Sequence, residues 1–195
     1  RDANATVESV EDEELEGLSD TESPQGVLLV CEEPTLSLED LLGRAPGRFL
    51  VLDGVQDPGN LGTLVRAARA FALDGVVALD GTVDPWNPKA VRASVGSSFH
   101  VGVLKAHWSE VGPELRDRGV ELLVAEAGGV DVAEVEPPPR WALVIGNEGR
   151  GVRDEVREAA QAVVTVPMPG GAESLNAGVA GAILLHSLTR SDAAL

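Results

Sequence analysis

Apolar runs and helical patterns alternate along the chain from Arg48 onward. Each run is long enough for one buried strand, and the runs lie at Phe49–Leu52, Val76–Leu79, Val101–Leu104, Val120–Ala125, Trp141–Ile145 and Ala162–Val166. Helical spacing of apolar residues occurs between them at 61–73, 88–96, 109–118 and 152–161, and a last helix is expected at 174–189. Continuous apolar strands that alternate with helices are typical of a mostly parallel sheet with helices on both faces. The pattern therefore predicts an α/β fold.

The beginning of the chain has a different character. Residues 1–23 are acidic and polar, with one short helical pattern at Val10–Leu18, and Gly26–Cys31 has the pattern of a short strand. We therefore expect an acidic segment at 1–35 and an α/β domain at 36–195. An acidic tail with one isolated strand is the simpler interpretation of the first region.

Composition narrows the class of protein. A chain of 195 residues with 44% hydrophobic residues is enough for one domain with a substantial core. The sequence has no apolar run long enough to span a bilayer, and its N-terminus lacks the features of a signal peptide. Its single cysteine cannot form an internal disulfide, and its three histidines are scattered. We expect a cytoplasmic protein with no bound metal and no membrane association.

The charge of the chain is unevenly distributed. The net charge is −17, whereas RNA affinity depends largely on Lys and Arg side chains that neutralise phosphates. Residues 1–40 hold 13 acidic residues and one basic residue, and the remaining 155 residues hold 19 acidic and 14 basic residues. The α/β region is thus only moderately acidic, but the sequence shows no basic stripe, which predicts weak unaided binding to RNA.

A first motif, DPGNLG at 57–62, connects the strand at 49–52 to the next helix. Asn60 is well placed as the N-cap of this helix. Arg66 and Arg69 fall outside its apolar stripe, at the carboxyl end of a strand, where open α/β sheets place their sites. A capped helix with two solvent-exposed arginines explains the same residues.

A second motif, IGNEGRG at 145–151, follows the strand at 141–145 and contains Glu148. Its glycines allow tight turns and close approach to a ligand. A dinucleotide-binding fingerprint is not expected, because the glycines are in the wrong order and on a late strand. A glycine-rich turn between a strand and a helix is the simpler interpretation.

A third motif combines VPM at 166–168, a flexible PGG at 169–171 and SLN at 174–176. Ser174 is expected to cap the last helix. Small residues at 177, 178 and 180–182 allow another backbone to pack closely against that helix, although ordinary core packing explains them as well.

In this order and spacing, the three motifs resemble motifs 1, 2 and 3 of the SpoU (TrmH-type) RNA 2′-O-ribose methyltransferases, from about Phe49 to Thr189. The resemblance implies a C-terminal trefoil knot in the parallel sheet, S-adenosylmethionine bound within the knot, and a homodimer whose active sites are completed across the interface. The positions that match cofactor-binding residues are Gly146, Val166 and Leu175, with Ile145, Met168 and Asn176 close by.

The resemblance also implies the roles of the polar residues. Arg66 matches the catalytic arginine of the family, and its guanidinium is a reluctant base that would stabilise the developing alkoxide of a ribose 2′-oxygen. The side chains that would orient Arg66, the ribose and the loops are Asn60, Glu148, Ser174 and Asn176. Residues 23–27 resemble the last strand of a ribosomal-protein-like substrate-binding domain, so that segment 1–35 would be a remnant of that domain.

The leading hypothesis is therefore an S-adenosylmethionine-dependent 2′-O-methyltransferase of structured RNA, and the remnant favours ribosomal RNA over tRNA. The sequence does not separate housekeeping modification from antibiotic resistance. A non-catalytic knotted module that binds S-adenosylmethionine and acts in ribosome assembly is a second hypothesis, against which the intact Arg66, Glu148 and Asn176 argue. An unrelated α/β nucleotide-binding enzyme is not expected to carry all three motifs in order.

Overall fold

The structure, a computed structural model, describes residues 6–21 and 23–190. The chain divides into two compact units, 1–34 and 35–195, which are described separately. The first unit contains helix α1 (Asp12–Leu18), where the helical pattern predicted one. Among the described residues no helix is both long and apolar enough to cross a membrane.

The strand predicted at Gly26–Cys31 does not form. These residues have no regular secondary structure, and Val27, Leu29 and Val30 are largely exposed. A strand needs a neighbour that satisfies its backbone N–H and C=O groups, and the described residues of the first unit contain no second strand. The prediction of a strand was therefore wrong.

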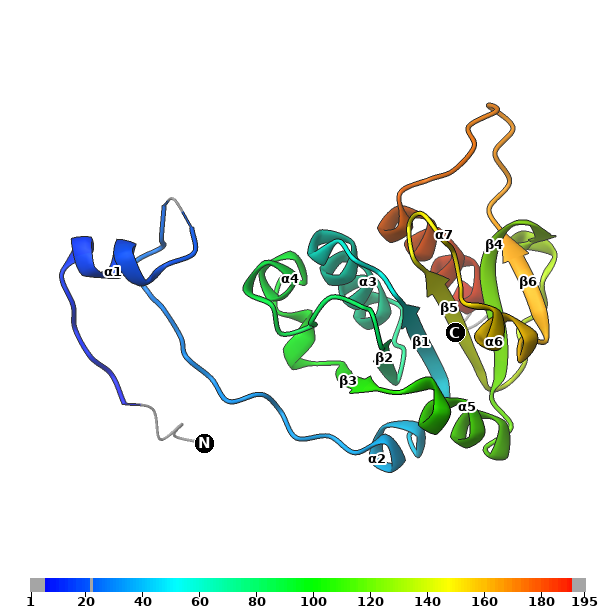
Figure 1. The fold of residues 1–195 in the computed structure, drawn as a ribbon, viewed down its shortest axis with the longest axis horizontal. Coiled ribbons are helices and arrows are strands. Elements are labelled where there is room, and N and C mark those ends of the chain that lie inside the picture. Colours follow the sequence, from blue (N-terminus) through cyan, green and yellow to red (C-terminus); the bar gives the residue numbers. More distant parts are fainter. Residues whose placement is uncertain (1–5, 22, 191–195) are drawn as a thin grey trace. The chain divides into compact units, whose positions relative to one another are not determined.

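The second unit is built on a six-stranded sheet in which every neighbouring pair is parallel, in the order β3-β2-β1-β5-β4-β6 (Figure 1). The strands are β1 (Arg48–Asp53), β2 (Gly75–Leu79), β3 (Gly102–Ala106), β4 (Glu121–Asp131), β5 (Trp141–Gly146) and β6 (Ala162–Thr165). All six strands predicted after Arg48 are present. The central strands β1 and β5 pair in register, with Asp53 opposite Gly146, so the first and second motifs leave the sheet at the same edge.

Helices cover both faces of the sheet, as predicted for this fold class. One face carries α3 (Pro58–Ala70), α4 (Pro88–Ala93), the 3₁₀ turns η1 (Ser97–Phe99) and η2 (Val132–Glu134), and α7 (Ala177–Thr189). The other face carries α2 (Leu38–Leu42), α5 (Trp108–Asp117) and α6 (Asp154–Glu158). Side chains of β1 alternate between the two cores: Leu50 and Leu52 face the first, Phe49 and Val51 the second.

The small residues of α7 allow it to lie directly against α3. A Cβ atom added at Gly181 would overlap the side chain of Leu64, and one added at Gly178 would lie 3.1 Å from Thr63 Cγ2. Segment 166–176 projects from the sheet between β6 and α7 (Figure 1). The close packing of α3 on α7 therefore brings the helices of the first and third motifs together.

This packing predicts that Gly181→Val destabilises the domain by about 1–3 kcal/mol, because the added methyl groups force α7 away from α3. Chemical denaturation measures the free energy of unfolding. Gly170→Val is the matched control, since a Cβ there meets no atom within 4 Å and the substitution should have little effect. Equal stability of the two variants would contradict the packing described here.

Candidate functional site

Three side chains from the three motifs form one hydrogen-bonded chain at the carboxyl edge of the sheet. Asn176 Nδ2 donates to Asn60 Oδ1 over 2.7 Å, and Asn60 Nδ2 donates to Glu148 Oε1 over 2.9 Å. Asn60 is 8% exposed, so its amide has little access to competing water. The hydrogen bonds thereby connect the starts of α3 and α7 to the glycine-rich loop after β5.

Asn60 is not the N-cap of α3, so that prediction was wrong. The helix begins at Pro58, and the carboxylate of Asp57 caps it by accepting from the Asn60 amide over 2.8 Å. Proline is favoured in the first turn of a helix and aspartate immediately before it, so the Asp-Pro pair was the better sequence signal. The shift places the Asn60 side chain within the first turn, free to bind Glu148 and Asn176.

Glu148 is an anchor for the segment that precedes α3. Its carboxylate also accepts from the backbone amides of Gln56 at 3.2 Å and Asp57 at 3.4 Å. Burial by itself raises the pKa of Glu148, but the hydrogen bond from Asn60 and those from backbone amides outweigh burial, and the pKa is lowered. Glu148 is therefore ionised at neutral pH and suited to holding donors in place rather than to exchanging protons.

Asn176, and not Ser174, caps the last helix. Helix α7 begins at Ala177, and Asn176 Oδ1 accepts from the Val179 amide over 3.2 Å. The prediction that Ser174 caps this helix was therefore wrong, and asparagine is as good an N-cap as serine. The Asn176 amide caps α7 with its oxygen and reaches Asn60 with its nitrogen, whereas Ser174 lies before the helix in the loop.

Asn147 shapes the glycine-rich loop, a role that the sequence analysis missed. Its Oδ1 accepts from the amides of Gly149 and Arg150, each at 3.0 Å, and its Nδ2 donates to Gly54 O over 2.8 Å. An asparagine that bonds to the backbone two residues later is a common turn former, so the Asn-Glu-Gly sequence was a usable signal. Gly146 is required because a Cβ there would collide with the backbone of Gly151.

An ion pair between a buried aspartate and a half-buried arginine fixes the other end of this loop. Asp53, at the end of β1, is 3% exposed; its Oδ1 pairs with Arg153 Nε at 2.6 Å and its Oδ2 accepts from the Arg153 amide at 2.8 Å. The same guanidinium donates to Asp80 O over 2.7 Å. This pair was not predicted, because its two residues are 100 positions apart in the sequence.

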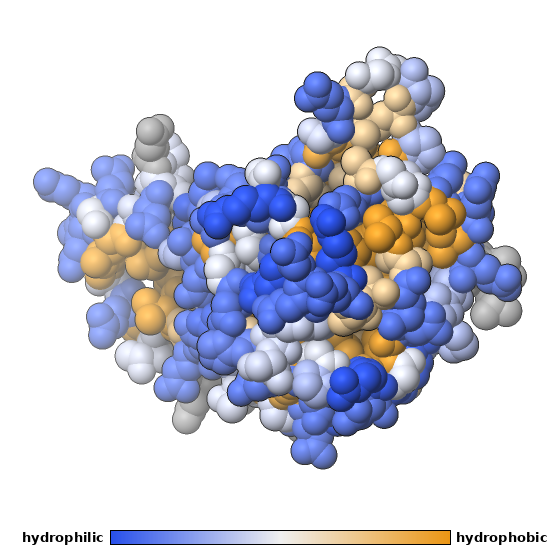
Figure 2. Space-filling view, turned by 45° about the vertical axis from the view of Figure 1, so that its right-hand side comes forward, coloured by the Kyte–Doolittle hydropathy of each residue, from blue (hydrophilic) through white to orange (hydrophobic). Residues whose placement is uncertain are grey.

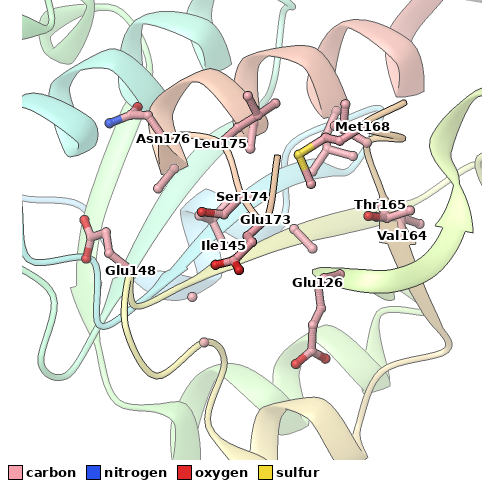
Figure 3. A pocket seen from close by; sticks show the side chains of 18 of the residues that line it. Glu126, Ile145, Glu148, Val164, Thr165, Met168, Glu173, Ser174, Leu175 and Asn176 are labelled. Carbon is pink, nitrogen blue, oxygen red and sulfur yellow. The ribbon is translucent and has the colours of Figure 1, made fainter. Parts of the chain in front are cut away.

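A cavity of about 480 Å³ lies between the projecting loop, the middle of β4 and the carboxyl ends of β5 and β6 (Figure 3). All six positions predicted to bind the cofactor line it, namely Ile145, Gly146, Val166, Met168, Leu175 and Asn176. Ser174 and Glu148 line it as well. Figure 2 shows apolar surface directly below the projecting loop. The sequence thus identified residues that the fold brings to one cavity.

The charged side chains that line the cavity in the described part of the chain are all acidic. Among the described residues, its lining includes the carboxylates of Glu126, Glu148 and Glu173 and no Lys or Arg side chain. Glu126 is paired with Arg157, which lies outside the lining. Carboxylates attract a cationic group, and side chains such as Ile145 and Leu184 offer an apolar surface. The cavity therefore suits a small ligand that combines an apolar part with positive charge.

Arg66 is separate from this cavity within one chain. It lies on the exposed side of α3, makes no hydrogen bond or ion pair with the described residues, and does not line the cavity. Of the five predicted catalytic residues, Glu148, Ser174 and Asn176 lie at the cavity and Asn60 contacts two of them. Arg66 is the one that the fold leaves apart.

Comparison with known proteins agrees with this geometry. The profile of the SpoU rRNA Methylase family matches residues 47–186. The chain is 41% identical over 172 residues to a protein of Bacillus subtilis named 23S rRNA (guanosine(2553)-2′-O)-methyltransferase RlmP, covering 88% of this chain and 67% of that protein. It is 34% identical over 194 residues to a Bordetella pertussis protein named 23S rRNA (guanosine-2′-O-)-methyltransferase RlmB, covering 96% of this chain and 79% of that protein.

Solved structures share the fold. An AdoMet-bound rRNA methyltransferase from Sinorhizobium meliloti superposes with a TM-score of 0.87 at 30% identity, covering 93% of this chain and 70% of the other. The AdoMet complex of the SpoU methyltransferase AviRb from Streptomyces viridochromogenes gives a TM-score of 0.78 at 28% identity, covering 84% and 64% of the two chains.

The capping geometry predicts that Asn176→Ala lowers the free energy of unfolding by about 1–2 kcal/mol, because an end amide of α7 and the Asn60 carbonyl both lose a partner. Ser174→Ala is the matched control and should leave stability nearly unchanged. Thermal and denaturant unfolding measure both variants. A larger loss for Ser174→Ala would show that the serine caps the helix.

The environment of Glu148 predicts a pH-dependent stability difference. Because its pKa is lower in the folded state than in the unfolded chain, the carboxylate stabilises the fold above the unfolded pKa, and this stabilisation is lost as pH falls through the folded pKa. Glu148→Gln should therefore be less stable than the unsubstituted protein at about pH 7, with the gap narrowing toward about pH 3. Denaturant unfolding across this range measures the gap, and a pH-independent gap would contradict the role of the charge.

Proposed function

The chain belongs to the SpoU rRNA methylase family, and we propose that it transfers the methyl group of S-adenosylmethionine to a ribose 2′-hydroxyl of ribosomal RNA. One observation carries the proposal: the side chains of Asn60, Glu148 and Asn176 join the three motifs beside one cavity. The names of the two relatives support ribosomal RNA as the substrate class.

The cavity fits the cofactor in chemistry and size. S-adenosylmethionine carries an adenine, which apolar walls such as Ile145 and Leu184 accommodate, and a sulfonium, which the carboxylates attract. When bound, it supplies a methyl group on a cationic sulfur that is ready for in-line transfer. We assign Gly146, Val166 and Leu175 to cofactor binding, with the flanking Ile145, Met168 and Asn176 completing the enclosure.

The positive charge of Arg66 stabilises the ribose oxygen as it reacts. A ribose hydroxyl is a poor nucleophile, and negative charge develops on its oxygen as it attacks the methyl group. The positively charged guanidinium stabilises this charge and the adjacent phosphate and does not take the hydroxyl proton, which passes to water as the oxygen–methyl bond forms. Asn60 stands six residues before Arg66 on the same helix, so the bonds of Asn60 to Glu148 and Asn176 orient the helix that presents Arg66.

We further propose that the protein acts as a homodimer in which Arg66 of one protomer serves the cavity of the other. The separation of Arg66 from its own cavity supports this arrangement. Apolar side chains on and next to α7 support it too: Leu175, Val179 and Ile183 are 39%, 47% and 38% exposed. Val179 and Ile183 are one turn apart and form a stripe that a second copy would cover.

The remaining assignments are proposals of the same kind. We propose that segment 166–176 and α7 form the trefoil knot of the family, supported by the likeness to its solved members. Residues 1–35 are assigned to a ribosomal-protein-like substrate-binding domain and 36–195 to the methyltransferase domain. The proposed ribosomal RNA substrate supports a cytoplasmic location, and the proposed reaction requires no metal.

A non-catalytic role in ribosome assembly is the second candidate, because the fold and the cavity would serve it equally. The hydrogen-bonded orientation of the α3 start favours catalysis, since a cofactor-binding module has no use for an oriented Arg66. Methylation of tRNA is separated from methylation of ribosomal RNA by the choice of RNA in the assay.

The proposal predicts that Arg66→Ala abolishes methyl transfer to 23S rRNA transcripts while leaving the affinity for S-adenosylmethionine unchanged. Isothermal titration calorimetry measures binding, with NAD and ATP as control ligands, and transfer of a tritiated methyl group measures activity. Arg116→Ala is the matched control, because this arginine is 77% exposed on the opposite face of the sheet. Full activity of Arg66→Ala would remove this residue from the mechanism.

The shared active site can be tested with mixed dimers. Arg66→Ala and Gly146→Val should each be inactive as homodimers, whereas their mixture should recover part of the activity, because one site then has both an intact cavity and an intact arginine. No recovery after subunit exchange, verified by native mass spectrometry, would argue against a site completed across the interface.

A further inference from the structure

An exposed aromatic ring lies close to α3 and has no part in the proposed reaction. Phe99, at the end of η1, is 61% exposed, whereas the other Phe and Trp side chains, all within the described residues, are buried or half-buried. Val95, just before η1, is 63% exposed. Phe99 is thus the one exposed ring among the six Phe and Trp side chains, all of which lie within the described residues.

The backbone before Phe99 holds an unfavourable conformation. After α4, Val95 and Gly96 both have positive φ, at 50° and 75°. Glycine adopts this region readily, but a β-branched valine does so only at a cost of free energy. The turn buries Ser97 and Ser98 and leaves the larger Phe99 in solvent. The turn thus buries two small polar side chains and exposes a large apolar one, which is the reverse of the usual distribution between core and surface.

Close packing of α3 on α4 fixes the position of this surface. A Cβ at Gly62 would lie 2.5 Å from both Ala90 O and Ala93 Cβ, so the two helices are in contact there. Arg66 follows Gly62 by four residues and therefore lies on the same side of α3, one turn along. Helix α3 also contacts η1, which carries Phe99. Arg66 and Phe99 thus belong to adjoining parts of one surface.

This surface is positively charged within an acidic protein. Residues 58–73 and 85–109 contain no Asp or Glu. Helices α3 and α4 carry four exposed cationic side chains, namely Arg66, Arg69, Lys89 and Arg92. None of them makes a side-chain hydrogen bond or ion pair with the described residues. Asp84, the nearest acid before α4, is paired with Lys105. The sequence shows no basic stripe because the cations come from two helices that only the fold places side by side.

We propose that Phe99 and the cations of α3 and α4 form the surface that holds RNA beside the methylated ribose, with Phe99 stacked on an unpaired base. This inference rests on the proposed function. A ring beside unpaired arginines and lysines is what single-stranded nucleic acid requires, because bases stack on aromatic faces and phosphates pair with cations. Arg66 then acts on the ribose while Arg92 and Lys89 contact the neighbouring phosphates.

Fluorescence anisotropy tests the surface with a labelled transcript of 23S rRNA that spans guanosine 2553, the nucleotide in the name of the Bacillus relative. Phe99→Ala should weaken binding about tenfold with an unchanged salt dependence, since stacking involves no counterion release. Arg92→Gln should lower the slope of log affinity against log salt by about one. Arg116→Gln, a matched arginine on the opposite face, should bind in the same way as the unsubstituted protein.

Two results would overturn the inference. One is Phe99→Ala and Arg92→Gln binding the transcript as tightly as the control. The other is a change in solution mass on Phe99→Ala, measured by light scattering, which would make this surface a contact between protein chains.

The same experiment separates this inference from the proposed function. RNA binding that depends on Phe99 without any methyl transfer would retain the surface and reject the enzyme. Methyl transfer with binding that is indifferent to Phe99 and Arg92 would retain the enzyme and reject the surface.

Discussion

The carboxylate of Glu148 is the acceptor on which the arrangement of the site depends. It accepts from the Asn60 side chain and from two backbone amides before α3, and through Asn60 it is connected to the cap of α7. A charged acceptor forms stronger hydrogen bonds than a neutral one, so a single ionised group fixes three segments of chain. The glycine-rich loop that carries Glu148 is in turn held by Asn147 and by the ion pair of Asp53 with Arg153.

Helix packing and polar contacts determine different features of the site. The glycines of α3 and α7 set how closely the helices approach, because Gly62 admits α4 and Gly181 admits Leu64. The amides and carboxylates then determine how the helix starts are oriented within that packing. Both sets are needed to define the site, because the packing brings the helices together and the hydrogen bonds then fix the polar side chains at the helix starts.

Much of the architecture could be predicted from the sequence, because buried parallel strands are continuous apolar runs and helices follow a different period. All strands after Arg48 follow from these patterns, and eight of the site residues predicted from the three motifs line the cavity. The lining residues of β4 and α7, such as Glu126 and Leu184, were not predicted. The caps were misplaced: Asp57 and Asn176 are caps where Asn60 and Ser174 were expected, because neighbouring residues of similar type compete and only tertiary contacts decide. The strand at Gly26–Cys31 failed because strand formation needs a partner, which propensity does not supply. Asp53–Arg153 and the basic surface depend on residues distant in sequence, and one sequence contains no information on such pairs.

The hydrogen bonds of the site span long stretches of chain. Asn60 is separated from Glu148 by 88 residues and from Asn176 by 116. Contacts of such high sequence separation form only after the loops between them have closed, so topologies of this kind fold slowly. No folding intermediate that lacks either β5 or α7 can present the complete cavity. Cofactor binding therefore reports that the domain has finished folding, and at saturating concentration the cofactor stabilises the whole domain rather than any part of it.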